Sequence, residues 1–421
     1  MYHCHMIQPK NLSELSLKSL KVALVVSETN NVSKAANQLN RSQSAISKAI
    51  QGLEQKLEVT LFDRSPIGMT LTSKGFVLIA GIEEAVQQFQ YAAKAYAKIT
   101  NQACPIGKNP IFDLNISYSR LQALLLVQEA SGVKEAAQQM QVSRTSLYDA
   151  IHFIEQLLDI PLFERNACGN VATPFCLALA RHIRLAFTSM QNALDSIASE
   201  DGAVRGKVVI VAFPVVRNYL LPAVCVQVRR EHPGIEILLK DGLYRDVESQ
   251  LRSGEIDFLV GTFYEHEQVL PDDLEQTLLF KAPLQMIVRK DHPLLTISSI
   301  SNEDLKAYSW ILPPARSPAR QIYQQRLDEL GLEGLDCQIE AYSYSLQREI
   351  LCQSNSIGLA FQHQSVHEEN SGLLRALPIT LSSPISLGIT QRKYTSHSSP
   401  AKVLQQALLE MAENIGNCSA R

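Results

Sequence analysis

The sequence of 421 residues lacks the patterns that mark several common classes of protein. Its eight cysteines are scattered, and no two have the C-x-x-C spacing that indicates a zinc site or a dithiol redox centre. No run of about 18 apolar residues indicates a membrane span. No apolar run follows a basic segment at the start, so we expect no signal peptide. A cytoplasmic protein with reduced thiols is the simplest interpretation.

Motifs of the common enzyme classes are also missing. We find no G-x-S-x-G, H-E-x-x-H, G-x-G-x-x-G or G-x-x-x-x-G-K-S/T in a supporting context. His3-Cys4-His5 could bind a metal ion or belong to a loose terminus, and we favour the second interpretation. We therefore expect no enzyme, no cofactor and no metal site.

Composition allows several domains and gives no sign of nucleic-acid binding by the chain as a whole. The length predicts about two to four domains, and 46% hydrophobic residues are enough for packed cores. The net charge is only −3, so charge has to be compared by region. Residues 13–76 hold eight Lys or Arg and five acids (+3), whereas 114–177 hold four and six (−2).

A repeat at a fixed offset of 101 residues is the most informative pattern in the chain. Residues 13–99 and 114–200 align without a gap. The matches fall mostly where we expect burial, whereas polar positions on one helix face have diverged. Identical pairs include Ala35-Ala36 with Ala136-Ala137, Glu54-Gln55 with Glu155-Gln156, Leu61-Phe62 with Leu162-Phe163, Arg64 with Arg165, Gly68 with Gly169 and Thr72 with Thr173. The repeat predicts two copies of one small domain.

The first copy has the pattern of a helix-turn-helix. Ser33 is a plausible N-cap for a short helix, and Asn40-Arg41 fits a tight turn. Ser42 can cap the next helix, on which apolar residues recur at helical spacing: Ile46, Ile50, Leu53 and Leu57. Such a second helix can enter the major groove of DNA.

Polar residues occupy another side of that second helix, namely Gln43, Ser44, Ser47 and Lys48. Gln suits adenine, Lys suits guanine or phosphate, and Ser is permissive. Residues 64–72 can then form a two-stranded wing, with phosphate contacts from Arg64, Ser65, Thr70 and Thr72. A small helical interaction domain with an ordinary solvated face fits the same pattern, and the residues alone leave both interpretations open.

A longer series resembles the N-terminal signature of LysR-type transcriptional regulators. The matching residues are Ala35-Ala36, Leu39, 42–47, Ile50, Leu53-Glu54, Leu57, Leu61-Phe62, Arg64, Leu71-Thr72 and Gly75. The resemblance implies a winged helix-turn-helix whose recognition helix contains 42–48. It implies DNA contacts from Ser33, Arg41, Ser42, Gln43, Ser44, Ser47, Lys48, Arg64 and Thr72. The sequence departs from the family at Ser44, where proline is common.

Each copy ends in a predicted long helix with a heptad-like apolar seam. The seam residues are Ile82, Val86, Phe89, Ala93 and Tyr96 in the first copy and Ile183, Phe187, Met190, Leu194 and Ile197 in the second. Such a seam suits pairing with another helix. In the resembled family this linker helix makes the dimer, which implies a homodimer or homotetramer. Packing onto the chain's own core is the alternative.

The second copy keeps the apolar stripe as Leu147, Ile151, Ile154 and Leu158, but its polar face is rewritten. The replacements are Gln43 by Arg144, Ser44 by Thr145, Ser47 by Tyr148, Lys48 by Asp149 and Gly75 by Cys176. Ser143, Arg144, Thr145 and Tyr148 could form a second DNA reader with a new specificity. Alternatively, Tyr148 and Asp149 obstruct docking and the negative charge repels phosphate. We favour the second interpretation, in which this copy serves in assembly or as a spacer.

From residue 207 onward, short apolar runs alternate with helical stretches, which predicts α/β lobes with a mostly parallel sheet. Two sets of runs indicate two lobes. The predicted strands are 208–213, 235–239, 256–261, 278–280, 284–288, 310–312, 337–341, 357–361 and 385–390. We expect helices at 219–231 and 245–253, and a last helix at 401–414 that packs back onto the first lobe.

Residues 206–416 resemble the effector-binding domain of the same family. The matching segments are Gly206-Lys207-Val208, Leu220-Leu221-Pro222, 232–235, Leu251, 254–258 and 291–294. The resemblance implies two lobes of the periplasmic-binding-protein type with a small ligand in the cleft. By position, the cleft candidates are Pro214, Val215, Arg217, Thr262, Phe263, Arg316, Ser317 and Gln362. Family members often have a hydroxyl residue where Val215 stands, which argues against a simple carboxylate effector.

These patterns predict a sequence-specific bacterial transcription regulator. The expected parts are a winged helix-turn-helix (13–75), a linker helix (76–100), a diverged second copy of each (114–176 and 177–200) and a two-lobed effector domain (206–416). The expected partners are double-stranded DNA, a small-molecule effector, further copies of the chain and RNA polymerase, with no membrane. The competing interpretations are a regulator acting mostly through protein contacts, and a ligand-binding protein or enzyme that uses only the α/β part.

Overall fold

The computed structural model describes residues 11–65, 68–100, 109–129, 133–166, 169–199, 204–240, 244–263, 270–315, 317–379, 381, 384–393 and 397–419. The chain forms two compact units, the first made mainly by residues 1–206 and the second mainly by the rest. The cluster His3-Cys4-His5, Pro66 within the predicted wing and residues 101–108 between the two copies lie outside the described residues.

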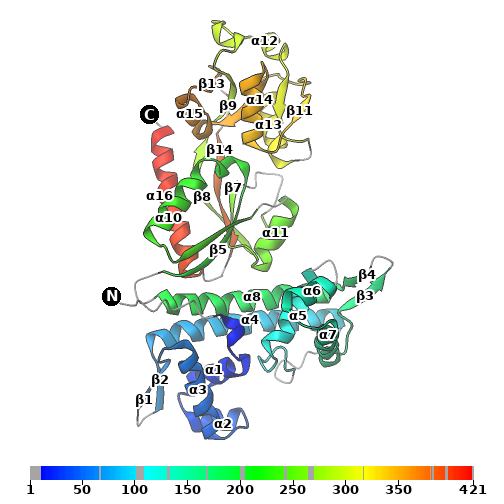
Figure 1. Cartoon of the computed structure of the whole chain (residues 1–421), viewed down its shortest axis with the longest axis vertical. Helices are drawn as coiled ribbons and strands as arrows, with labels where there is room; N and C mark the ends of the chain where they lie inside the picture. The colour runs from blue at the N-terminus through cyan, green and yellow to red at the C-terminus, as the bar shows by residue number, and fades with distance from the viewer. Residues whose placement is uncertain are drawn as a thin grey trace. The chain divides into compact units, whose positions relative to one another are not determined.

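The first unit contains two copies of one series of elements, in each of which three helices precede a two-stranded wing and a long helix (Figure 1). The first copy consists of η1 (Leu12–Glu14), α1 (Leu17–Thr29), α2 (Val32–Gln38), α3 (Gln43–Leu57), β1 (Phe62–Ser65), β2 (Gly68–Leu71) and α4 (Ser73–Thr100). The second consists of α5 (Tyr118–Glu129), α6 (Val133–Met140), α7 (Arg144–Leu158), β3 (Phe163–Asn166), β4 (Gly169–Ala172) and α8 (Pro174–Ser199).

Capping residues set where α2 and α3 begin. The prediction that Ser33 caps α2 is wrong, because Asn31 takes that place in an extended conformation. The Asn31 side-chain oxygen accepts from the backbone N–H groups of Ser33 and Lys34 at 2.8 and 3.1 Å, so Ser33 lies inside the first turn. Ser42 caps α3 as predicted and accepts from the Ala45 backbone N–H at 3.2 Å.

One apolar core runs through both copies. The predicted stripes are confirmed as buried on α3 (Ile46, Ile50, Leu53 and Leu57) and on α7 (Leu147, Ile151, Ile154 and Leu158). Burial of each such side chain stabilises the fold by about 1.5–3 kcal/mol relative to exposure. The predicted wing is also present, since β1 and β2 pair antiparallel with Phe62 opposite Leu71.

The second unit has two five-stranded sheets, ordered β6-β5-β7-β14-β8 and β11-β10-β12-β9-β13. The first lobe contains β5 (Gly206–Ala212), α9 (Pro214–Arg217), α10 (Leu220–Glu231), β6 (Ile235–Lys240), α11 (Tyr244–Ser253), β7 (Phe258–Thr262), β8 (Leu274–Ala282) and β14 (Ile385–Arg392). The other lobe contains β9 (Leu284–Arg289), η2 (Pro293–Thr296), α12 (Asn302–Lys306), β10 (Trp310–Leu312), α13 (Pro318–Asp328), β11 (Ile339–Glu340), α14 (Tyr344–Gln353), β12 (Ile357–Phe361), α15 (Gln362–Asn370) and β13 (Leu374–Ala376).

Both sheets are mixed, so the prediction of a mostly parallel sheet is wrong. In the first lobe β14 pairs antiparallel with β7 and with β8, and in the other lobe β9 pairs antiparallel with β12 and with β13. The physical reason is that the chain leaves the first lobe after β8 and returns as β14, so these two strands run in opposite directions side by side. Parallel pairing is kept between β5 and β7 and between β10 and its neighbours β11 and β12.

The last helix, α16 (Ser399–Ser419), lies on the first lobe, as predicted. Its Leu404 and Leu408 side chains are fully buried. Gln405 donates from its side-chain amide to the side-chain oxygen of Gln391 in β14 at 2.9 Å. This helix therefore completes the core of the lobe in which the α/β segment begins.

Candidate functional site

The N-terminal half of α3 presents a polar, solvent-exposed face above a buried stripe. Gln43, Ser44 and Lys48 are exposed, and Ser47 is half-buried. Arg41 and Ser42, in the turn before the helix, are also exposed. The unpaired backbone N–H groups at a helix N-terminus carry partial positive charge. The structure thus gathers the predicted residues 41–48 at one positive helix end.

The wing is tied to the turn between α1 and α2. The Met69 backbone N–H donates to the Asn30 carbonyl at 3.0 Å. Gly68 approaches the same carbonyl so closely that an added Cβ would lie 2.3 Å from its oxygen, and its φ of +146° also requires glycine. Arg64 is exposed on β1. The wing is therefore held in a fixed position next to the α1–α2 turn.

Thr72 and Glu54 hold the wing from its other end. The Thr72 hydroxyl donates to the Thr60 carbonyl at 2.8 Å and accepts from the Gly75 backbone N–H at 3.0 Å. The Glu54 carboxylate accepts from the backbone N–H groups of Leu61 and Phe62 at 2.8 and 3.2 Å. Thr72 thus starts α4, and Glu54 positions the wing, a role that neither the repeat nor the family signature had indicated.

The second copy repeats the scaffold but has a different set of charges on its exposed face. Ser143 caps α7 by accepting from the Ser146 backbone N–H at 3.0 Å. Arg144, Thr145 and Tyr148 are exposed on α7, Tyr148 to 50%. Exposed cations at Lys34, Arg41 and Lys48 correspond to the exposed residues Glu135, Val142 and Asp149. The second copy therefore lacks three of the positive charges that surround the first recognition face, and it has exposed cations at Lys134 and Arg144 in place of Ser33 and Gln43.

In the second unit, hydrogen bonds join two of the predicted effector segments across the lobes. His363 on α15 donates from Nε2 to the Val215 carbonyl at 2.8 Å, and Gln364 donates to the Pro214 carbonyl at 3.3 Å. Burial lowers the pKa of His363 against the opposite effect of its hydrogen bond to Val215, and the lowered pKa favours the neutral ring. In the described part of the chain, His363 Nδ1 and Gln362 Oε1 are buried acceptors without a hydrogen-bond partner.

The other predicted effector-binding residues are spread over several elements. Arg217 donates to the carbonyl of Ala212 from Nε and Nη2 at 3.1 and 2.7 Å, which holds the guanidinium against the end of β5. Thr262 ends β7, and the Phe263 backbone N–H donates to the Ser386 carbonyl at 3.0 Å. Arg316 lies outside the described residues. The hydrogen bonds from His363 and Gln364 thus bring the Pro214–Val215 segment to the start of α15, next to Gln362.

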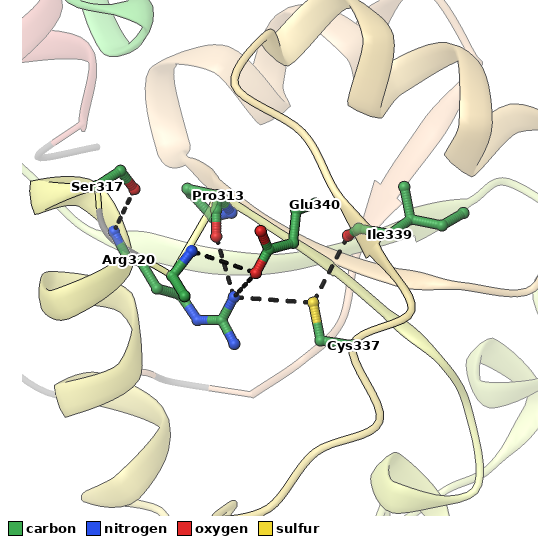
Figure 2. A network of polar contacts seen from close by, with 7 residues as sticks. Pro313, Ser317, Arg320, Cys337, Ile339 and Glu340 are labelled. Atoms are coloured by element: carbon green, nitrogen blue, oxygen red, sulfur yellow. Dashed lines mark hydrogen bonds and ion pairs between the residues drawn. The ribbon is translucent and has the colours of Figure 1, made fainter. Parts of the chain in front are cut away.

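Ser317 belongs to a polar network at the start of α13 (Figure 2). It caps the helix by accepting from the Arg320 backbone N–H at 3.2 Å. The Arg320 guanidinium donates to the Pro313 carbonyl at 3.0 Å and lies 3.6 Å from the Glu340 carboxylate. Glu340 in turn accepts from the Ala315 backbone N–H at 3.2 Å. The network fixes the loop after β10, which the sequence analysis had named only through Arg316 and Ser317.

Comparison with known families decides what these parts are. Two segments, 17–76 and 118–176, match the family model described as "Bacterial regulatory helix-turn-helix protein, lysR family". Residues 201–413 match the LysR substrate binding domain. The chain belongs to the LysR family. This LysR-type protein is therefore a DNA-binding transcription regulator with a substrate-binding domain for an effector, and it is not an enzyme.

Individual relatives of this LysR regulator differ in how much of it they cover. The HTH-type transcriptional regulator GalR of Pseudomonas putida is 25% identical over 397 residues, 94% of this chain and 97% of its own length. PcaQ of Agrobacterium fabrum is 26% identical over 303 residues, 71% of this chain and 96% of its own length. The alignment with GalR is thus long enough to extend over the second helix-turn-helix copy.

The fold is also found among solved structures of the family. A full-length variant of OxyR from Pseudomonas aeruginosa has a TM-score of 0.51 at 17% identity, covering 71% of this LysR regulator and 95% of OxyR. LysR regulators bind DNA and small-molecule effectors and are oligomeric. In the described residues, no helix has the length and apolar character needed to span a membrane.

Proposed function

We propose that this regulator reads its operator through the exposed N-terminal face of α3. Gln43, Ser44, Ser47 and Lys48 meet base edges in the major groove, where glutamine suits adenine and lysine suits guanine. Ser33, Arg41, Ser42, Arg64 and Thr72 lie nearer the phosphates, and Thr72 contributes mainly by starting α4. The observation that carries the proposal is the capped, exposed start of α3 above a buried stripe.

A binding assay on the full chain tests this proposal. Operator sequences are first selected from a random duplex library, and affinity is then measured against salt. We expect Gln43→Ala to relax the base preference at one position and Lys48→Ala to weaken binding and relax the base preference at another. Lys98→Ala removes the same charge from the exposed far end of α4 and is the matched control. Equal effects of both lysine variants would contradict the proposal.

We further propose that the second helix-turn-helix serves mainly in assembly. Its exposed Glu135 and Asp149 oppose phosphate, and Tyr148 stands where the first copy has a small serine. The alternative is a second reader made of Ser143, Arg144, Thr145 and Tyr148. A loss of affinity by two orders of magnitude from Arg144→Ala, equal to that from Gln43→Ala, would favour the alternative.

For the effector we propose a small molecule that carries hydrogen-bond donors. Gln362 Oε1 and His363 Nδ1 are buried acceptors beside the lobe junction at Val215. An unpaired buried acceptor costs about 1–3 kcal/mol, which a ligand donor would recover. Thr262, Phe263, Arg316 and Ser317 would line the rest of the site, with Arg217 supporting it through β5.

Thermal stabilisation of the full chain by small hydroxylated compounds, each paired with its O-methylated counterpart, tests the effector proposal. We expect the hydroxylated member of an active pair to raise the melting temperature, and Gln362→Leu to reduce that preference. A preference for the methylated member would reject the proposal of a hydrogen-bond-donating effector.

We also propose that the protein acts in the cytoplasm, that it forms a homodimer or homotetramer, and that it contacts RNA polymerase.

A further inference from the structure

The two long helices of the repeat pair with each other inside one chain. Figure 1 shows α4 and α8 side by side, and they form the most extensive helix–helix contact of the described residues. Gly81 of α4 lies so close to α8 that an added Cβ would be 2.5 Å from the Cβ of Ala193 and 2.9 Å from the Ser189 carbonyl oxygen. The apolar seam of α4 in the first copy is therefore covered by α8 of the second copy.

The pairing follows an approximate two-fold relation. His182 Nδ1 donates to the Gln88 side-chain oxygen at 3.0 Å. With the offset of 101 residues, His182 is the counterpart of Gly81, and Gln88 is the counterpart of Ser189. The Gly81–Ser189 and His182–Gln88 contacts thus join equivalent positions of the two copies, as in the isologous interface of a dimer.

The pairing also favours unlike helices. Gly81 meets Ser189, so that two small residues permit close approach, whereas the two longer side chains of His182 and Gln88 hydrogen-bond to each other. Two copies of α4 paired in the same way would place Gly81 opposite Gln88 twice, and the Gln88 amide would lose its histidine donor. The divergence between the two copies at this contact therefore matches each helix to the other.

Each long helix also reaches the compact part of the opposite copy. The Tyr96 hydroxyl of α4 donates to the Leu158 carbonyl at the end of α7 at 2.9 Å. The Gln191 side chain of α8 accepts from the Leu12 backbone N–H in η1 at 3.0 Å. Of the ten predicted seam residues, Val86 is half-buried and the other nine are buried within the chain: Ile82, Phe89, Ala93, Tyr96, Ile183, Phe187, Met190, Leu194 and Ile197.

We propose that a single chain supplies both halves of the paired helix-turn-helix unit, so that α4 and α8 exclude the linker helix of a second chain from this seam. The inference rests on the proposed function only in naming the unit a DNA-binding one. Its consequence is a pair of unlike modules: the first has exposed cations at Lys34, Arg41 and Lys48, and the second has Glu135, Val142 and Asp149 at the matching positions. Contacts between chains then have to use surfaces outside the α4–α8 seam.

Cross-linking of co-expressed chains tests the inference without DNA. Full-length chains that carry only Gln88→Cys and chains that carry only His182→Cys are co-expressed and treated with a short bismaleimide. The double variant Gln88→Cys/His182→Cys and the unmodified chain, with its native cysteines, are treated in parallel. We expect the 88–182 linked peptide at one-chain mass from the double variant, and none from the co-expressed single variants. That peptide at two-chain mass from the co-expressed chains would overturn the inference.

A second measurement uses the unmodified chain and so does not depend on folding of the variants. Lys21 of α1 forms a salt bridge with Asp113 in the turn before α5. A carbodiimide should join these two side chains as an amide. Recovery of the Lys21–Asp113 peptide from the one-chain band supports the inference, and its recovery only from a two-chain band contradicts it. Because neither assay involves DNA, failure of the proposed α3 contacts would leave both results unchanged.

Discussion

Glu54 and Leu61 are joined by a hydrogen bond of 2.8 Å from the Leu61 backbone N–H to the carboxylate, and Glu155 and Leu162 repeat it at 2.8 Å in the second copy. The bond fixes the chain where it leaves α3 or α7 for the wing. A charged acceptor on a backbone N–H contributes about 1.5–3 kcal/mol. This relation between a helix and its wing is among the features most closely kept by the repeat.

We predict that Glu54→Ala lowers the free energy of unfolding by about 1–3 kcal/mol, because two backbone N–H groups lose their acceptor. Glu54→Gln keeps a neutral acceptor and should lower it less. Denaturant unfolding monitored by circular dichroism measures both. Glu155→Ala is the matched variant, and a change of less than about half a kcal/mol for both alanine variants would show that these bonds contribute little.

We predict that Tyr96→Phe lowers the free energy of unfolding by about 1 kcal/mol, since it removes a buried hydrogen bond to the Leu158 carbonyl and leaves the ring in place. Tyr91, five residues earlier on α4, is 41% exposed, so Tyr91→Phe should have little effect. Urea unfolding curves of the two variants give the comparison. An equal effect of the two changes would argue against an energetic role for the Tyr96–Leu158 bond.

The stability of the first unit should fall with pH because of His182. Burial, and secondarily the charge of Arg181, lowers the pKa of His182 from 6.5 to about 4. Between these values the unfolded chain binds the proton and the folded chain does not, so the free energy of unfolding decreases as pH falls from 6.5 towards 4. Melting temperatures across this range should show a shallower decline for His182→Gln. A decline as steep as that of the unmodified chain would contradict the assignment of this pH dependence to His182.

Replacement of Gly68 should loosen the wing. Gly68→Ala places a Cβ 2.3 Å from the Asn30 carbonyl oxygen at a φ of +146°, which we expect to cost about 1–3 kcal/mol. Gly52→Ala on α3 meets no atom within 4 Å and should stabilise the helix by up to about 1 kcal/mol. Thermal unfolding distinguishes the two, and a stabilising Gly68→Ala would contradict the close approach.

Restoring positive charge to the second copy should increase its affinity for DNA. We predict that Glu135→Lys with Asp149→Lys tightens binding to a random-sequence duplex and makes the salt slope steeper by up to about 2, because each lysine can neutralise one phosphate. Glu135→Gln with Asp149→Asn keeps the shape and should give a smaller gain. Unchanged affinity of the lysine variant at low salt would show that charge does not limit DNA binding by the second copy.

Local signals predicted much of the helix-turn-helix, and non-local arrangements were predicted less well. The stripe from Ile46 to Leu57 and the Ser42 cap depend on residues within two or three turns, which a sequence pattern records directly. Ser33 was mistaken for a cap because asparagine at position 31 has the same ability two residues earlier. β13 was missed, because only Leu374 of its three residues is buried and no apolar run marks the strand.

Sheet direction and helix pairing depend on contacts between distant segments. The apolar runs at β8 and β14 were predicted. Neither run indicates that the chain leaves the first lobe after β8 and returns as β14, and this path sets the direction of the two strands. The seam of α4 likewise predicted a partner helix without naming it. The contacts of Gly81 and His182 identify α8 as that partner, and no periodicity within a single helix could have done so.

The pairing of α4 with α8 also bears on how the amount of protein affects its assembly. Two helices that belong to one polypeptide meet at a local concentration set by the chain between them, and not by how many copies a cell makes. Dilution that would separate two independent subunits leaves such a pair intact. Because the two modules always meet DNA together, the exposed face of one can differ from that of the other without weakening their pairing.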